Sequence, residues 1–157
     1  MEDTKEFFFN QIRNGDIDTI RKMILDDPAW VHVKDPRGST PLILATYYNQ
    51  GAITDLLLDK GSRIDEKDAS GNTALMGVCF KGFTEIAKNL IEKGADVNVR
   101  NVMDATCLIY AVTFNKEEIV KLLIAHGADT EARDARGHTA LDHAKMQGIP
   151  ALIALLG

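Results

Sequence analysis

The sequence has few cysteines and no long apolar run. Its 157 residues include only two cysteines, Cys79 and Cys107. Two are too few for the disulfide framework of a small secreted domain, so we expect both thiols to be reduced and buried, and the compartment to be cytoplasmic. The longest apolar run, residues 151–156, is far shorter than the about 20 residues that cross a bilayer. No membrane span is predicted.

The sequence also lacks an excess of basic residues. Lys and Arg number 18 against 23 Asp and Glu, for a net charge of -5. Nucleic-acid binding needs a basic stripe along the phosphates, and anionic membranes also attract basic segments, so both partners are excluded. Residues 1–6 are acidic and only Phe7, Phe8 and Phe9 follow, so we expect no signal peptide. With 45% hydrophobic and 26% charged residues, the chain has the composition of a folded domain.

Motifs of catalysis are missing as well. The sequence has no glycine-rich phosphate loop, no paired-carboxylate motif and no nucleophile elbow. Cys79 could pair with a histidine base, but it lies where small residues pack between helices, and a buried thiol is inert. His138 and His143 bracket Asp142, yet a spacing of five across a helix start does not place two ligands on one helical face. We predict no enzyme, no cofactor and no metal site.

The sequence does contain an internal repeat with a period of 33 residues. Asp35, Asp68, Asn101 and Asp134 stand 33 residues apart, and four further columns keep this spacing without a gap. These columns are Gly38, Gly71, Asp104 and Gly137; Thr40, Thr73, Thr106 and Thr139; Leu42, Leu75, Leu108 and Leu141; and Ala45, Val78, Ala111 and Ala144. Self-similarity at this period is typical of proteins built from stacked structural repeats.

Each period predicts two helices joined by a turn. The threonine supplies an N-cap whose hydroxyl accepts from a free amide of the first turn, and Pro41 suits the first helical position. Fourteen residues after each Asp or Asn of the first column comes a residue that adopts positive φ easily, so the first helix ends there. These residues are Asn49, Gly82, Asn115 and Gly148. A second helix follows and ends at Gly61, Gly94 or Gly127.

Two segments resemble the ankyrin repeat: Gly38-Ser-Thr-Pro-Leu-Ile-Leu-Ala45 and Leu90-Ile-Glu-Lys-Gly-Ala-Asp-Val-Asn98. The resemblance covers residues 35–157 closely and residues 4–34 more loosely. It implies an all-α ankyrin-repeat solenoid, a single domain over residues 1–157 of helix–turn–helix units joined by hairpin-like loops. We expect an N-terminal capping repeat (1–34), full repeats (35–67, 68–100 and 101–133) and a truncated C-terminal repeat (134–157). The linker 26–35 is similar to those of small stand-alone ankyrin proteins of bacteria.

The sequence departs from the family pattern at several positions, among them Asp104 in place of the turn glycine and Ala74, Cys107 and Ala140 in place of the proline. The family has a histidine after Thr-Pro-Leu that bridges neighbouring loops; here that place holds Ile43, Met76, Ile109 and Asp142. We therefore expect the loops to depend more on packing and less on hydrogen bonds. Gly77 lies inside a predicted helix, where glycine costs about 1 kcal/mol against alanine.

Asn98 lies at the loop position that asparaginyl hydroxylases modify in some ankyrin proteins. Asparagine is common at this position in the family, so its presence does not by itself predict modification.

The resemblance implies that the chain mediates protein–protein contacts. The first helices and loop tips form the concave surface of such a solenoid, and large apolar or cationic residues recur at its exposed positions. The predicted partner-binding residues are Arg37, Tyr47, Tyr48, Phe80, Lys81, Val102, Met103, Phe114 and Arg136. The alternative for each ring is packing sideways against its own repeat. The whole set favours an interface with another protein of unknown identity, centred on Tyr47, Phe80 and Phe114.

The C-terminal segment leaves a second hypothesis open. Residues 150–156 carry no charge, whereas a terminal repeat normally has a polar outer face. Either this segment is a short cap of a monomer, which we prefer, or it is an interface for self-association.

Trp30, in the linker after the first unit, is predicted to anchor the N-terminal cap.

Overall fold

The computed structural model describes residues 3–157, so Met1 and Glu2 of the acidic N-terminal segment lie outside the described residues. Within this range the chain is entirely helical, with no β-strand. Its elements are α1 (Thr4–Asn14), α2 (Ile17–Asp26), the 3-10 helix η1 (Pro28–His32), α3 (Pro41–Tyr47), α4 (Gly51–Asp59), α5 (Ala74–Lys81), α6 (Thr84–Glu92), α7 (Cys107–Thr113), α8 (Glu117–Ala125), α9 (Ala140–Gln147) and α10 (Pro150–Leu156).

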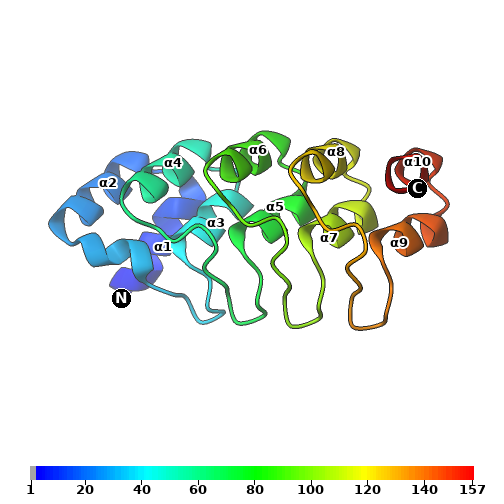
Figure 1. The fold of residues 1–157 in the computed structure, drawn as a ribbon. Coiled ribbons are helices and arrows are strands. Elements are labelled where there is room, and N and C mark those ends of the chain that lie inside the picture. Colours follow the sequence, from blue (N-terminus) through cyan, green and yellow to red (C-terminus); the bar gives the residue numbers. More distant parts are fainter. Residues whose placement is uncertain (1–2) are drawn as a thin grey trace.

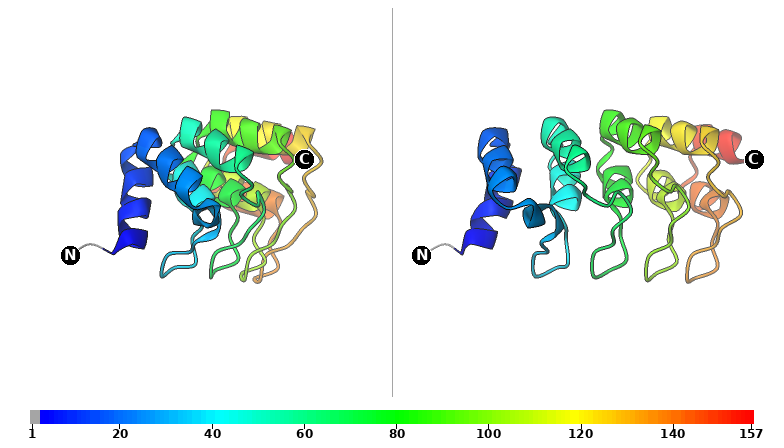
Figure 2. Two further views of the ribbon diagram at one scale, coloured as in Figure 1. Left: turned by 90° about the vertical axis from the view of Figure 1, so that its left-hand side faces the viewer. Right: turned by 60° about the vertical axis from the view of Figure 1, so that its left-hand side comes forward.

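The helices form pairs that stack in a single row from one end of the molecule to the other (Figure 1). The first helices of the pairs, α1, α3, α5, α7 and α9, make one layer, and α2, α4, α6, α8 and α10 make the other. Long loops extend from the side of the first-helix layer and lie next to one another in every view (Figure 2). The first helices and the loops therefore bound a common surface.

The predicted threonine caps begin four of the first helices. Thr40, Thr73, Thr106 and Thr139 have extended backbone, and each hydroxyl accepts from the amide three residues on. The positions predicted to end these helices have positive φ, with Asn49 at 59° and Asn115 at 54°. Asp104, which replaces the turn glycine, also has positive φ. The sequence columns thus correspond to fixed backbone positions.

One apolar core runs through the whole stack. The leucine column is buried between the layers in the central repeats, and the second helices add residues such as Ile53, Leu90 and Leu123. α3 is buried at six of its seven positions, whereas α6 buries one side only. The central first helices, α3, α5 and α7, are therefore the inside of the solenoid, and their last turns and the loops remain to contact a partner.

Backbone hydrogen bonds join neighbouring loop tips, which the sequence had indicated would depend mainly on packing. The amides of Ala69, Val102 and Ala135 donate to carbonyls of the preceding tip at 2.9–3.2 Å. Farther up the loops, the Asn98 amide donates to the Gly127 carbonyl at 3.1 Å and its oxygen accepts from the Asp129 N–H at 2.8 Å. Asn98 thus ties two repeats together, and the loops form a continuous ribbon.

α10 packs its apolar side chains on α8 and α9. Leu152 is fully buried, and Ile153, Leu155 and Leu156 are half-buried against the core. Among residues 3–157, none of the exposed large apolar side chains belongs to α10. The uncharged segment therefore covers the end of the core. Within the same residues no helix combines the length and apolar character needed to span a bilayer.

Candidate protein-binding surface

A row of aromatic rings crosses the last turns of three first helices. Tyr47 ends α3, Phe80 lies in the last turn of α5, and Phe114 follows α7. The Tyr47 and Phe80 rings are parallel with centroids 6.4 Å apart, and the Phe80 and Phe114 rings meet edge to face at 4.6 Å. Each remains 37–40% exposed. The repeat period thus brings together side chains that are about 33 residues apart in sequence.

Gly77 and Lys81 lie beside the Tyr47 end of this row. A Cβ on Gly77 would stand 3.4 Å from Tyr47 Cδ1, an ordinary van der Waals distance, so the ring packs directly over this position. The Lys81 Nζ lies 4.9 Å from the Tyr47 centroid, a cation–π contact. The sequence marked Gly77 as unfavourable in a helix, and its distance to the Tyr47 ring does not require glycine there.

A hollow of about 690 Å³ lies on the N-terminal side of the row. Tyr47, Tyr48 and Gly77 form one wall, and the loop residues Arg37 and Ala69 form another. Arg13 completes it from α1 and lies 5.9 Å from the Tyr48 ring centroid. The sequence argument missed Arg13 because the first repeat is one residue out of register with the others.

A second hollow of about 210 Å³ lies on the C-terminal side. It is lined by Phe114 and by Met103 and Arg136 from two successive loop tips. Phe80 contacts the aromatic residues of both hollows and so forms the ridge between them. Val102, 69% exposed, lies at a loop tip outside both hollows. The structure thus groups eight of the nine predicted residues along one ridge and its two hollows.

Two cations of this surface, Arg37 and Arg136, are available to a partner. Among residues 3–157, neither Arg37 nor Arg136 forms a salt bridge, and both are exposed. The Oδ1 atoms of the nearby Asp35 and Asp68 each accept two backbone N–H groups of their own loops. The loop scaffold therefore engages these carboxylates, while the two guanidinium groups remain unpaired.

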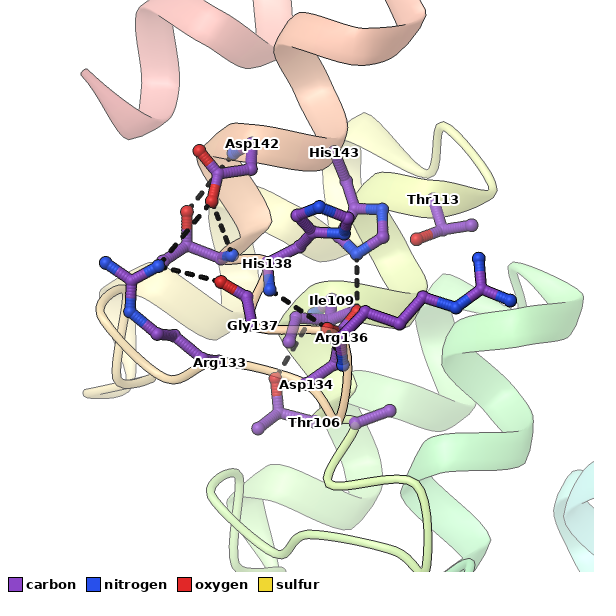
Figure 3. A network of polar contacts seen from close by, with 12 residues as sticks. Thr106, Ile109, Thr113, Arg133, Asp134, Arg136, Gly137, His138, Asp142 and His143 are labelled. Carbon is purple, nitrogen blue, oxygen red and sulfur yellow. Dashed lines mark hydrogen bonds and ion pairs between the residues drawn. The ribbon is translucent and has the colours of Figure 1, made fainter.

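A polar cluster closes the C-terminal end of the surface (Figure 3). Asp134 Oδ2 lies 2.8 Å from His143 Nε2, and the His138 and His143 rings meet edge to face at 5.5 Å. Burial opposes ionisation of Asp134, but the N–H groups of His138 and Arg136 and the His143 side chain outweigh it and lower its pKa. A spacing of five does not place both histidines on one helical face, so the sequence predicted no shared site. The structure brings them together because His138 lies on the loop and His143 on the helix.

Asp142, which the sequence placed between these histidines, serves the helix instead. Its Oδ2 accepts from the Thr139 N–H at 2.9 Å while its own N–H donates to the Thr139 hydroxyl at 3.1 Å, a reciprocal capping box. The Thr139 hydrogen bonds hold the pKa of Asp142 below its usual value. Arg133 Nη1 donates to the Gly137 carbonyl at 2.7 Å and lies 3.9 Å from Asp142 Oδ2. These contacts fix the loop on the start of α9.

The two thiols lie inside the core. Cys79 and Cys107 are free and fully buried. A hydrogen bond with Cys107, together with burial, raises the pKa of Cys79 well above its ordinary value. A nucleophilic cysteine needs the opposite, a lowered pKa and access to solvent.

The stacked helix pairs and their row of hydrogen-bonded loops define a helical repeat solenoid. Its exposed residues on the first-helix and loop side differ from one repeat to the next. Sequence models of ankyrin repeats match the chain over residues 8–101, as three copies, and over residues 90–144. The chain belongs to the ankyrin repeat family. Ankyrin repeats are generally protein–protein interaction modules and typically non-catalytic scaffolds. No curated protein matches the chain.

Proposed function

We propose that this protein is a non-enzymatic scaffold that binds another protein on the surface between its first helices and its loop tips. The observation that carries the proposal is the row of rings Tyr47, Phe80 and Phe114. Aromatic side chains are enriched at the centres of interfaces, where they give large contact area at low entropic cost. Three rings in mutual contact and about two-fifths exposed have the composition of such a centre.

The surroundings of the row support a partner of defined chemistry. Apolar side chains of a bound segment would fill the hollows on either side of Phe80, and carboxylates would pair with Arg37 and Arg136. Unpaired guanidinium groups favour planar, bidentate carboxylate partners. The preferred partner therefore presents apolar residues flanked by acidic ones, and the scaffold itself acts as a monomer.

The test compares two triple variants. Replacing Tyr47, Phe80 and Phe114 by Ala removes the row, while replacing Leu25, Lys88 and Lys121 by Ala changes exposed residues of the second-helix layer. Both proteins, with the wild type, are used to capture partners from lysate of the native cells, and isothermal titration calorimetry then measures affinity for a purified partner. We expect the first variant to keep its helical circular dichroism and lose binding, with hot-spot residues each worth about 2 kcal/mol or more.

The control triple variant should bind like the wild type. Equal affinity of a folded Tyr47/Phe80/Phe114 variant would overturn the proposal, and loss of fold in that variant would show that the rings belong to the core. Self-association through α10 is not proposed as a second function because its apolar side chains already cover α8 and α9.

A further inference from the structure

We propose that Asp134, His138 and His143 bind one zinc ion at the C-terminal end of the loop ribbon. The ligand atoms that these three residues offer, a carboxylate oxygen and one ring nitrogen of each histidine, all lie within 4.8 Å of one another. Figure 3 shows both imidazole rings beside the Asp134 carboxylate, one from the loop and one from α9. The proposal does not rest on the proposed protein-binding role, although Asp134 and His143 line one hollow of that surface.

The repeat itself explains why three ligands converge here. In the last four repeats the first-column residue turns back on its own loop. The Oδ1 atoms of Asp35, Asp68, Asn101 and Asp134 each accept from the amides two and four residues on, at 2.9–3.0 Å. In two of these repeats the other side-chain atom contacts the residue nine places on. Asn101 Nδ2 donates to Tyr110 Oη at 2.7 Å, and Asp134 Oδ2 meets His143 Nε2 at 2.8 Å.

The last repeat is the one that places ligands in all three columns. Four residues after the first column the repeats carry Ser39, Asn72, Ala105 and His138, and nine residues after it they carry Leu44, Gly77, Tyr110 and His143. The scaffold thus supplies a locked carboxylate, and the sequence of this repeat adds two imidazoles. Two backbone N–H groups on Oδ1 leave Oδ2 as the ligand atom, and hydrogen bonds of this kind orient the carboxylates of metal sites.

The donor set and its surroundings fit zinc. Two imidazole nitrogens and one carboxylate oxygen are ligands that zinc accepts, with three from the protein and a fourth position for water. Tetrahedral ligands at about 2.0–2.1 Å from zinc stand about 3.3 Å apart, so His138 must swing inward and the Asp134–His143 contact must open slightly. Asp134 and His143 also line the second hollow, which gives the ion a path of entry.

The test uses the full chain without an affinity tag, stripped of metal with a chelator and titrated with zinc chloride by isothermal calorimetry. The ligand variants are His138→Ala and His143→Leu, because Ala105 and Leu44 occupy these columns elsewhere in the stack and both are compatible with its fold. His32→Ala and His126→Ala are the controls, since both histidines are exposed and lie outside the cluster. Visible absorption of cobalt(II) at the same site reports a tetrahedral environment with histidine ligands.

We expect one zinc per chain. Each ligand variant should weaken zinc binding by about 100-fold or more, since loss of a residue that only hydrogen-bonds to a ligand already costs about 10–100-fold. Each should also remove the cobalt band. The controls should leave both readouts unchanged. If the wild type does not bind zinc in a one-to-one ratio, the cluster is only a hydrogen-bonded Asp134–His143 pair and the proposal is overturned. Binding that survives in both folded ligand variants would also overturn it, by placing the ion elsewhere.

Discussion

The two ends of the stack are closed by different means. At the N-terminal end, α1 extends over 11 residues and buries Phe8, Phe9 and Ile12, and the Trp30 ring stacks on Phe8 at 4.8 Å. At the C-terminal end, α9 and α10 together fully bury only Ala140, Ala144 and Leu152. Apolar stabilisation follows the area removed from water, so the aromatic end carries more of it than the end built from alanine and leucine.

This difference has a consequence for stability along the chain. In a repeat protein each unit contacts only its neighbours, so a terminal unit depends on one interface instead of two. The N-terminal unit compensates with large rings, and Trp30 takes the anchoring role predicted from the sequence. The C-terminal unit has less packing and more polar contact, through the capping box of α9 and the Asp134 cluster. We therefore expect the C-terminal end to open first.

The largest expected effect is the loss of the N-terminal aromatic packing. Phe8→Ala removes a fully buried ring that contacts Phe9 and Trp30. It should lower the free energy of unfolding by about 3–5 kcal/mol, the usual cost of Phe→Ala in a core. Urea unfolding followed by circular dichroism measures it. Phe7→Ala, at a ring that is 37% exposed, is the matched control and should cost far less; equal costs would contradict the packing described.

A smaller effect is expected at the opposite end from Leu155→Lys. Leu155 is half-buried against the core, and a lysine can keep part of its stem there while its ammonium reaches water. We expect the free energy of unfolding to fall by about 1 kcal/mol and hydrogen exchange in α10 to become faster. The protein should sediment as a monomer before and after the change. Leu25→Lys, at an exposed position on α2, should change stability by no more than about 0.5 kcal/mol.

The same variant decides between the two roles of α10. A wild-type protein that dimerises with concentration, and that Leu155→Lys returns to a monomer, would show that α10 is an interface and not a cap. A monomer at every concentration, with local opening in the variant, supports the short cap that the sequence favoured.

Sequence periodicity was enough to predict the helices, their caps and the row of rings, because each depends on residues that recur in fixed columns. Thr40 and its equivalents cap as predicted, and Tyr47 and Phe80 occupy one column and meet across repeats. Arg13 was missed because the first repeat breaks the register. The Asp134 cluster was missed because its histidines were compared by helical spacing, whereas the loop and the helix converge only in three dimensions. The backbone bonds between loop tips have no sequence signal at all.

The smallest expected effect concerns electrostatics, in which the middle of the stack differs from its C-terminal end. In the middle of the stack Asp55 on α4 accepts from the Lys93 ammonium and the Asn89 amide, both at 2.8 Å, and so ties α4 to the next repeat. α10 has no charged residue and can form no such tie to α8. The hydrogen bond from Lys93, with that from Asn89, lowers the pKa of Asp55.

A carboxylate whose pKa is lower in the folded state stabilises that state above its unfolded pKa of about 3.9, and this contribution disappears as the pH falls through the folded value. The stability difference between the wild type and Asp55→Asn should therefore be present at neutral pH and shrink on acidification. It should be small throughout, because the Asp55 side chain is 53% exposed and exposed ion pairs contribute little. Urea midpoints measured from about pH 6 down to about pH 3 follow it. In a Lys93→Ala background, Asp55→Asn should have much less effect at any pH, and an unchanged pH dependence there would place its origin outside this pair.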